Sequence, residues 1–155
     1  MSEPIRISSV PALKDFIGKP MGPSDWVTVT QERIQSFADA TGDHQWIHTD
    51  PERAKSESPF GGSIAHGYFT ISLAPALIAQ LFVIDGCSMT VNSGIEKMRL
   101  HEPVRAGGRI RLSAEIRGVR MLPTGSARTT IHFVFEVEGG RKPACVCDAV
   151  LVYIP

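Results

Sequence analysis

The chain has 155 residues, 43% of them hydrophobic and 21% charged, which suits one globular domain over residues 1–155. The 16 Lys and Arg residues balance 16 Asp and Glu residues, and this disfavours nucleic acid as a partner because no net positive field attracts phosphate. The N-terminus, MSEPIRISSV, lacks the apolar core of a signal peptide. Cys87, Cys145 and Cys147 form no CxxC pair, so we expect free thiols in the reducing cytoplasm.

The first part of the chain predicts short helices and one strand. Residues 8–18 have the pattern of a short helix, and residues 25–30 alternate as a strand does. Thr30 can cap a helix over residues 31–41, which Gly42 would end in the left-handed conformation.

A further helix should begin close to residue 50. Thr49 or Asp50 can cap it, Pro51 suits its first turn, and Glu52 stands three residues after Thr49 as in a capping box. Residues 43–48 are therefore predicted to form a loop between two helix ends.

The segment GYFTISLAPALIAQLFVI, residues 67–84, contains no charged residue over 18 positions, a length that raises the question of a membrane span. Thr70, Ser72, Pro75 and Gln80 and the lack of flanking Lys or Arg favour a helix buried in the core instead. We therefore expect one long central helix that starts near residue 65, and no association with a membrane.

The second half of the chain has the two-residue period of strands. Four segments are apolar on one or both faces, with turn signals at residues 123–125 and 139–140; they cover residues 88–100, 110–117, 131–137 and 145–153. Short connections make the sheet antiparallel, and its apolar face needs the central helix as a cover. This predicts an α+β hot-dog fold, a sheet wrapped around a long helix. One copy would expose a sheet edge, so we expect at least a dimer.

The stretch GDHQWIHTD, residues 42–50, concentrates acidic and histidine side chains. His44 and His48 have the spacing of zinc ligands on a helix. Since the helix should stop at Gly42 and restart near Asp50, that shared face is not expected, and we predict no metal. In a loop that turns back, Asp43 and His48 can instead converge on a water molecule and move its proton.

A third element is the AHGY stretch, residues 65–68. At the start of the buried helix, the Gly67 amide has no partner inside the helix, and the missing side chain lets a carbonyl oxygen approach. Tight packing alone would also explain a glycine here. Ser63 follows two glycines but has no GxSxG context, so a nucleophile is weakly indicated.

Together these stretches resemble the MaoC-like dehydratase family, which includes (R)-specific enoyl-CoA hydratases. FADATGDHQWIHTD is similar to the hydratase signature, and PFGGSIAHGYFTISL resembles the branch that contains nodulation protein N. The resemblance implies a homodimer that binds acyl-CoA and needs no cofactor. It also implies that Asp43 and His48 are the catalytic pair, and that the Gly67 amide polarises the thioester carbonyl.

Several positions depart from the family pattern. Gln45 and Trp46 replace Asn-Pro; together with Ser63 and His66 we assign them to substrate binding. Later in the chain, Ser93, Glu96 and Leu100 stand where the family would have Tyr, Asn and Phe, and Arg99, Arg105 and Arg109 are candidates for the CoA phosphates. The predicted reaction is reversible hydration of trans-2-enoyl-CoA. A non-catalytic acyl-thioester-binding module and an acyl-CoA thioesterase are the alternatives.

Overall fold

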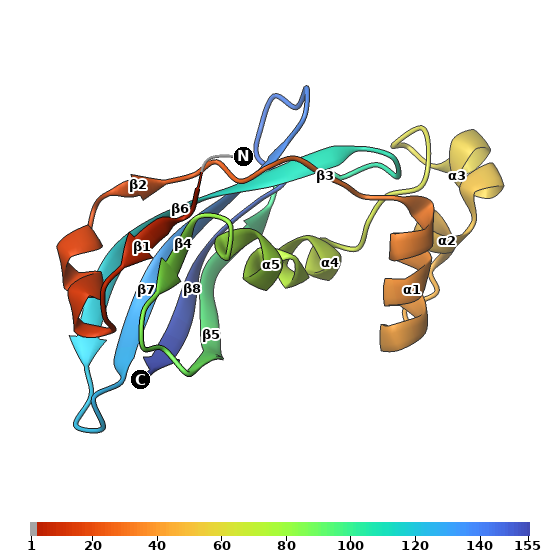
Figure 1. Ribbon diagram of the computed structural model, residues 1–155. Helices are drawn as coiled ribbons and strands as arrows, with labels where there is room; N and C mark the ends of the chain where they lie inside the picture. Colours follow the sequence, from red (N-terminus) through yellow and green to blue (C-terminus); the bar gives the residue numbers. More distant parts are fainter. Residues whose placement is uncertain (1–2) are drawn as a thin grey trace.

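The computed structural model describes residues 3–155, and its centre is a curved antiparallel sheet with two short helices against the concave face (Figure 1). The four main strands run in the order β6-β7-β8-β5, and two short strands, β2 and β3, pair with the free side of β6. These strands are β2 (Pro20–Met21), β3 (Val27–Thr28), β5 (Met89–Leu100), β6 (Arg109–Met121), β7 (Ala127–Val137) and β8 (Cys145–Ile154).

The four long strands confirm the sheet predicted from the two-residue period. Their inward positions are fully buried, as for Ile110, Ile131 and Phe135, while their neighbours along the strands are more exposed. The predicted turns join them, with Gly125 and Gly139 at positive φ values of 83° and 72°. Alternation therefore decides which face of the sheet covers the core.

The predicted long central helix is wrong in its length. The segment forms two helices, α4 (Gly67–Ser72) and α5 (Ala74–Ile78), followed by a short strand, β4 (Phe82–Ile84). Pro75 has no N–H to donate to the Ile71 carbonyl, so it cannot continue an α-helix from the preceding turn. The two helices still fill the predicted place, because Phe69 and Leu77 pack in one buried cluster with Phe133 and Phe135.

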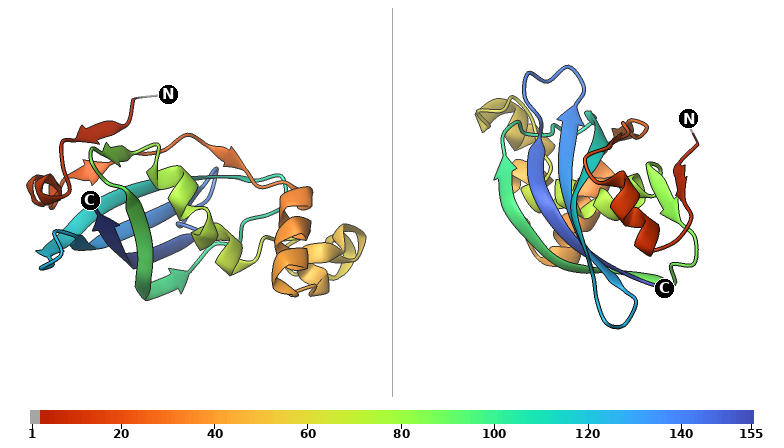
Figure 2. Two further views of the ribbon diagram at one scale, coloured as in Figure 1. Left: turned by 60° about the horizontal axis from the view of Figure 1, so that its bottom comes forward. Right: turned by 90° about the vertical axis from the view of Figure 1, so that its left-hand side faces the viewer.

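The other elements lie around this core. At the N-terminus, β1 (Ile5–Ile7) pairs in parallel with β4 and a 3₁₀ helix covers Pro11–Phe16, shorter than the predicted helix over 8–18. The predicted strand over 25–30 shrinks to the two residues of β3. Beyond one end of the sheet, three helices form a projecting group, seen in orange and yellow in Figure 2: α1 (Gln31–Thr41), α2 (Trp46–Thr49) and α3 (Pro51–Glu57).

Within residues 3–155, no helix is both long enough and apolar enough to cross a membrane. The apolar segment instead places its side chains against the sheet. The free edge of β5 is the opposite case: its residues are almost all exposed, and Met89, Ile95 and Leu100 are 53%, 49% and 54% exposed. An apolar strand edge of this length invites pairing with another chain.

Candidate active site

The candidate site lies where the projecting helices meet the start of α4. Helix α1 begins as predicted, since the Thr30 Oγ1 accepts from the Arg33 amide at 3.3 Å. It ends as predicted at Gly42, whose φ of 79° is left-handed and whose amide donates to the Ala38 carbonyl. This termination turns the chain and places Asp43 directly beyond the helix end, with its side chain 53% exposed.

The sequence predicted a loop over residues 43–48, but His48 lies in a helical turn. Residues 46–49 form the single turn α2, in which the Gln45 carbonyl accepts from the amides of His48 and Thr49. The next helix, α3, is capped by Asp50, whose carboxylate accepts from the Arg53 amide at 3.0 Å. Thr49 is not the cap: its hydroxyl donates back to the His44 and Gln45 carbonyls. The predicted capping box is thus replaced by a tight double turn.

This double turn buries His48, and among residues 3–155 only one of its two ring nitrogens has a hydrogen-bond partner. The His48 Nδ1 lies 2.6 Å from the Ile64 carbonyl oxygen, which can only accept, so Nδ1 carries a proton. The other nitrogen, Nε2, then has the lone pair. Burial lowers the pKa of His48, because desolvation of the charged form outweighs the stabilising bond to Ile64. The side chain is therefore suited to act as a base near neutral pH.

A residue that the sequence analysis missed, Gln31, also holds His48. Its Nε2 donates to the His48 carbonyl at 2.7 Å, and its Oε1 accepts from the Ser63 hydroxyl. Ser63 is 5% exposed, and its hydroxyl bond to Gln31 supports the turn from the protein interior. This burial does not fit the predicted contact with substrate. No local pattern signals this role, because Gln31 is simply the first residue of α1 and its partners lie 17 and 32 residues away.

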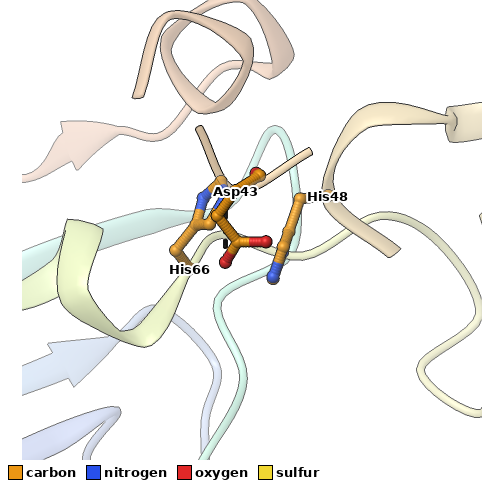
Figure 3. Close-up of side chains that lie close together, drawn as sticks. All are labelled: Asp43, His48 and His66. Atoms are coloured by element: carbon orange, nitrogen blue, oxygen red, sulfur yellow. Dashed lines mark hydrogen bonds and ion pairs between the residues drawn. The ribbon is translucent and has the colours of Figure 1, made fainter. Parts of the chain in front are cut away.

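Asp43, His48 and His66 come together at this place (Figure 3). One donor atom from each lies within 4.8 Å of the other two. The His48 and His66 rings stack at 3.9 Å between centroids with 25° between planes. The predicted pairing of Asp43 with His48 therefore has a geometric basis, and His66 is a third member on the buried side.

This group has the residue types of a zinc site, but its geometry suits an ion poorly. Imidazole nitrogens bind metals along lone pairs in the ring plane, at about 2.0–2.1 Å from the ion. In two nearly parallel stacked rings those directions do not converge. His44 lies apart from this group, since its Nε2 is 2.8 Å from the Asp39 carboxylate. The predicted separation of His44 from His48 is confirmed.

Gly67 follows His66 and begins α4, so its amide has no acceptor within the helix. The Leu100 side chain lies directly against it, and a methyl group at Gly67 would overlap with the Leu100 Cδ1. The missing side chain thus avoids an overlap that Leu100, which is 54% exposed, would otherwise relieve by turning away, and it suits a close approach. The helix dipole expected from a long helix is weaker here, because α4 has only six residues.

Gln45 and Trp46 lie at the outer side of the turn. Gln45 is exposed, and its backbone amide donates to the Asp43 carboxylate at 3.3 Å. The Arg53 guanidinium covers the Trp46 ring at 4.3 Å and also pairs with Glu57 at 3.0 Å. The indole is thereby held against α3, so the Trp46 side chain stabilises the double turn, to which Gln45 contributes through its backbone.

An apolar groove of about 960 Å³ lies between the α4–α5 pair and strands β4, β5 and β8. It begins with Ile71, one helical turn beyond Gly67, and reaches Tyr153. Of the positions that depart from the family pattern, Ser93 lines this groove, Leu100 covers Gly67, and Glu96 is exposed on β5.

The three arginines considered for the CoA phosphates differ in their engagement. Arg109 forms an ion pair with Glu138 on the neighbouring strand. The Arg99 guanidinium donates to the Met98 carbonyl at 2.8 Å. Arg105 is exposed, and its backbone pairs with Ile64 in the segment that leads to His66. Its position makes Arg105 the best placed of the three.

The fold and this site define a class of protein: a hot-dog domain with an Asp–His pair and, shortly after it in the chain, a glycine at a helix start. The chain belongs to the MaoC-like dehydratase family, whose model, described as "MaoC like domain", matches residues 13–133. The resemblance seen in the GDHQWIHTD and AHGY stretches is thereby confirmed.

Individual relatives agree with this placement. The chain is 46% identical over 146 residues to 3-hydroxyacyl-thioester dehydratase Z of Mycobacterium tuberculosis, covering 94% of this chain and 96% of that protein. It is 40% identical over 142 residues to nodulation protein N of Rhizobium leguminosarum bv. viciae, covering 88% and 85%. The solved (R)-hydratase from A. caviae superposes with a TM-score of 0.68 at 22% identity, covering 90% and 96%, and shows the same fold.

Proposed function

We propose that this protein is an (R)-specific enoyl-CoA hydratase that interconverts trans-2-enoyl-CoA and (R)-3-hydroxyacyl-CoA. The observation that carries the proposal is that a ring nitrogen of His48 and a carboxylate oxygen of Asp43 lie within 4.8 Å of each other, while the bond from Nδ1 to Ile64 leaves Nε2 to accept a proton. Two groups this close can hold one water molecule between them, at about 2.8 Å from each. Membership in the MaoC-like family and the similarity to a thioester dehydratase support the same reaction.

In the proposed reaction, the Gly67 amide donates to the thioester carbonyl oxygen, which draws electrons from the double bond and makes C3 electrophilic. The water held by Asp43 and His48 attacks C3, while one of the two side chains accepts its proton. The pair then returns a proton to C2 on the same face. One C–O and one C–H bond form, the C2–C3 π bond is lost, and no electrons leave the substrate, so the reaction requires no cofactor.

The apolar groove is the proposed site of the acyl chain. It starts next to the turn that carries Gly67, so a carbonyl at that amide would direct the chain along Ile71 and Pro75. The side chains around it are mostly apolar, as an acyl tail requires. The CoA phosphates would remain outside, where Arg105 is exposed.

We also propose a cytoplasmic homodimer formed along β5. Among residues 3–155, the outer edge of this strand has no strand partner, and its apolar side chains, including Val91 and Ile95, are exposed. A second copy would cover these side chains and satisfy the free backbone groups of the strand. The even charge balance of the chain provides no reason to expect nucleic acid or a membrane as a further partner.

The test is hydration of crotonyl-CoA, followed by loss of enoyl absorbance and by chiral analysis of the product. Asp43→Asn and His48→Gln should each lower kcat by about 10²–10⁴-fold, the usual contribution of general acid–base catalysis, with folding intact by circular dichroism. Wild-type turnover in both variants would refute the mechanism. Release of free thiol would indicate a thioesterase, and binding without loss of absorbance would indicate a non-catalytic module. A series of enoyl-CoAs with increasing chain length would show which acyl chains the groove accommodates.

A further inference from the structure

His66 is buried against two other rings. It is 3% exposed, with the His48 ring stacked on it at 3.9 Å and the Phe37 ring at 5.0 Å between centroids, tilted by 53°. A side chain so covered presents almost no surface to a bound molecule. The predicted role of His66 in contacting substrate therefore does not suit its position.

The polar contact of His66 points to the catalytic turn instead. Its Nε2 lies 2.9 Å from the Asp43 carbonyl oxygen, which only accepts, so Nε2 is the donor. The Asp43 carboxylate is farther away, at 3.9 Å from the same nitrogen, which is beyond hydrogen-bond distance. The imidazole thus holds the peptide group of Asp43 and leaves the carboxylate with one weak contact, from the Gln45 backbone amide at 3.3 Å. The other nitrogen, Nδ1, has no hydrogen-bond partner in the described part of the chain.

This contact links two parts of the site that are 23 residues apart in sequence. Asp43 follows the end of α1 and is exposed, so its backbone needs a fixed point. His66 immediately precedes Gly67, whose amide is proposed to bind the thioester carbonyl. A bond from His66 to the Asp43 peptide therefore fixes the carboxylate relative to that amide, and ring stacking fixes the imidazole of His48 in the same step.

We propose that His66 is a positioning residue that sets the geometry of Asp43 and His48 and does not contact the substrate. The inference rests on the proposed hydratase function for its kinetic consequence, while the geometry itself can be tested in the resting protein. Misplacement of a catalytic group by about 1 Å can lower a rate by about 10²-fold. Loss of His66 should therefore act on kcat and leave substrate affinity nearly unchanged.

Three substitutions of His66 separate the effect of its Nε2 hydrogen bond from the effect of its ring stacking. His66→Gln places an amide N–H close to the position of Nε2, whereas His66→Asn is one bond shorter and cannot reach the Asp43 carbonyl. His66→Phe keeps a ring for stacking but has no donor. The Gln and Asn variants have the same chemistry and differ in reach, so they form the matched pair, and they decide the matter if the Phe variant does not fold.

We expect His66→Asn and His66→Phe to lower kcat for crotonyl-CoA by about 10- to 100-fold, with KM within about twofold, and His66→Gln to recover most of the loss. The Asp43 carbonyl shares its peptide group with the His44 amide, so the nitrogen chemical shift of that backbone amide reports on the bond from His66. It should be nearly the same in wild type and in His66→Gln, and should shift in His66→Asn. Equal kcat in the Gln and Asn variants, or a raised KM at unchanged kcat, would overturn the proposal.

The NMR comparison also separates this proposal from the hydratase function. If the wild-type protein does not hydrate crotonyl-CoA, the proposed function fails, yet the His44 amide shift still reports on the bond to the Asp43 carbonyl. A His44 amide shift that is the same in wild type and His66→Asn would then overturn the role of His66. A changed shift in His66→Asn, restored in His66→Gln, would support it.

Discussion

The His48 Nδ1 donates to the Ile64 carbonyl at 2.6 Å, and this one bond determines which nitrogen of the ring can accept a proton. Ile64 lies 16 residues beyond His48, in the strand-like segment before α4. The Gln31–Ser63 bond and the His66 contact come to the turn from the same short segment. Asp43 and His48 are therefore held by consecutive residues, 63–66, which lead directly to Gly67, and these groups should move as one unit.

The first prediction concerns pH. Because burial lowers the pKa of His48 below the ordinary 6.5, the base should stay unprotonated down to that pH. We expect kcat/KM for hydration to remain level as the pH falls to 6.5 and to decline only below it. The fold should lose stability in the same range, since the unfolded chain takes up this proton at a higher pH than the folded chain does.

The measurement is a pH–rate profile together with an NMR titration of the His48 ring, assigned by comparison with His48→Gln. In that variant the part of the pH-dependent stability that depends on His48 should disappear. An acid limb centred above pH 6.5 would show that the His48 ring is not the buried base described here.

The second prediction concerns the cap of α3. Asp50→Ala removes the acceptor of the Arg53 amide and should destabilise the protein by about 1 kcal/mol, or roughly 2–4 °C in Tm. Asp50→Asn keeps a side-chain oxygen and should recover most of this loss. Thermal unfolding of the two variants gives the comparison. Equal loss in both would mean that the charge matters, and the hydrogen bond does not.

The sequence predicted those features that depend on local chemistry. Thr30 and Gly42 mark the two ends of α1 because capping and left-handed φ are properties of single residues. The alternation in β6 and β7 likewise predicted the buried face of the sheet, because successive side chains of a strand point to opposite faces. The end of α1 at Gly42 is also what places Asp43 beyond the helix and close to His48 of α2.

What the sequence did not predict depends on contacts between distant segments. The break between α4 and α5 was missed because the apolar run was given more weight than Pro75. Gln31 and the placement of His66 became visible only once residues 63–66 lay against α1 and α2. Ser63 and His66 lie close to His48 and Asp43, where their polar partners are protein atoms, and a contact with substrate stays a prediction.

The third prediction concerns the free edge of β5. Ile95→Lys places a charge in the proposed dimer interface, where Ile95 is 49% exposed in the single chain, and should shift the protein to monomers. Ile17→Lys is the matched control, because Ile17 has a similar exposure of 45%. Ile17 bridges to Ile116 of β6, at the opposite side of the sheet from β5. Sedimentation of both variants at equal concentration tests this. Dissociation in both, or in neither, would argue against β5 as the interface.

The last prediction separates the two reasons for a glycine at position 67. If the Gly67 amide binds the thioester carbonyl, a methyl group there should obstruct the approach, and Gly67→Ala should lower kcat by about 10²–10³-fold, as for the loss of one oxyanion donor. If the glycine serves only packing, the loss would come from the overlap with Leu100. Since Leu100 is 54% exposed, its side chain has room to turn away, and the variant should fold.

The double variant Gly67→Ala/Leu100→Ala removes the overlap and keeps the methyl group. We expect it to stay as slow as Gly67→Ala, while Leu100→Ala alone stays within about fivefold of wild type, because a half-exposed leucine at a strand end contributes little to the reaction. Recovery of activity in the double variant would assign the glycine to packing against Leu100. Continued loss, with both proteins folded and stable, would assign it to the carbonyl, since no other contact at Gly67 would then differ between the pair.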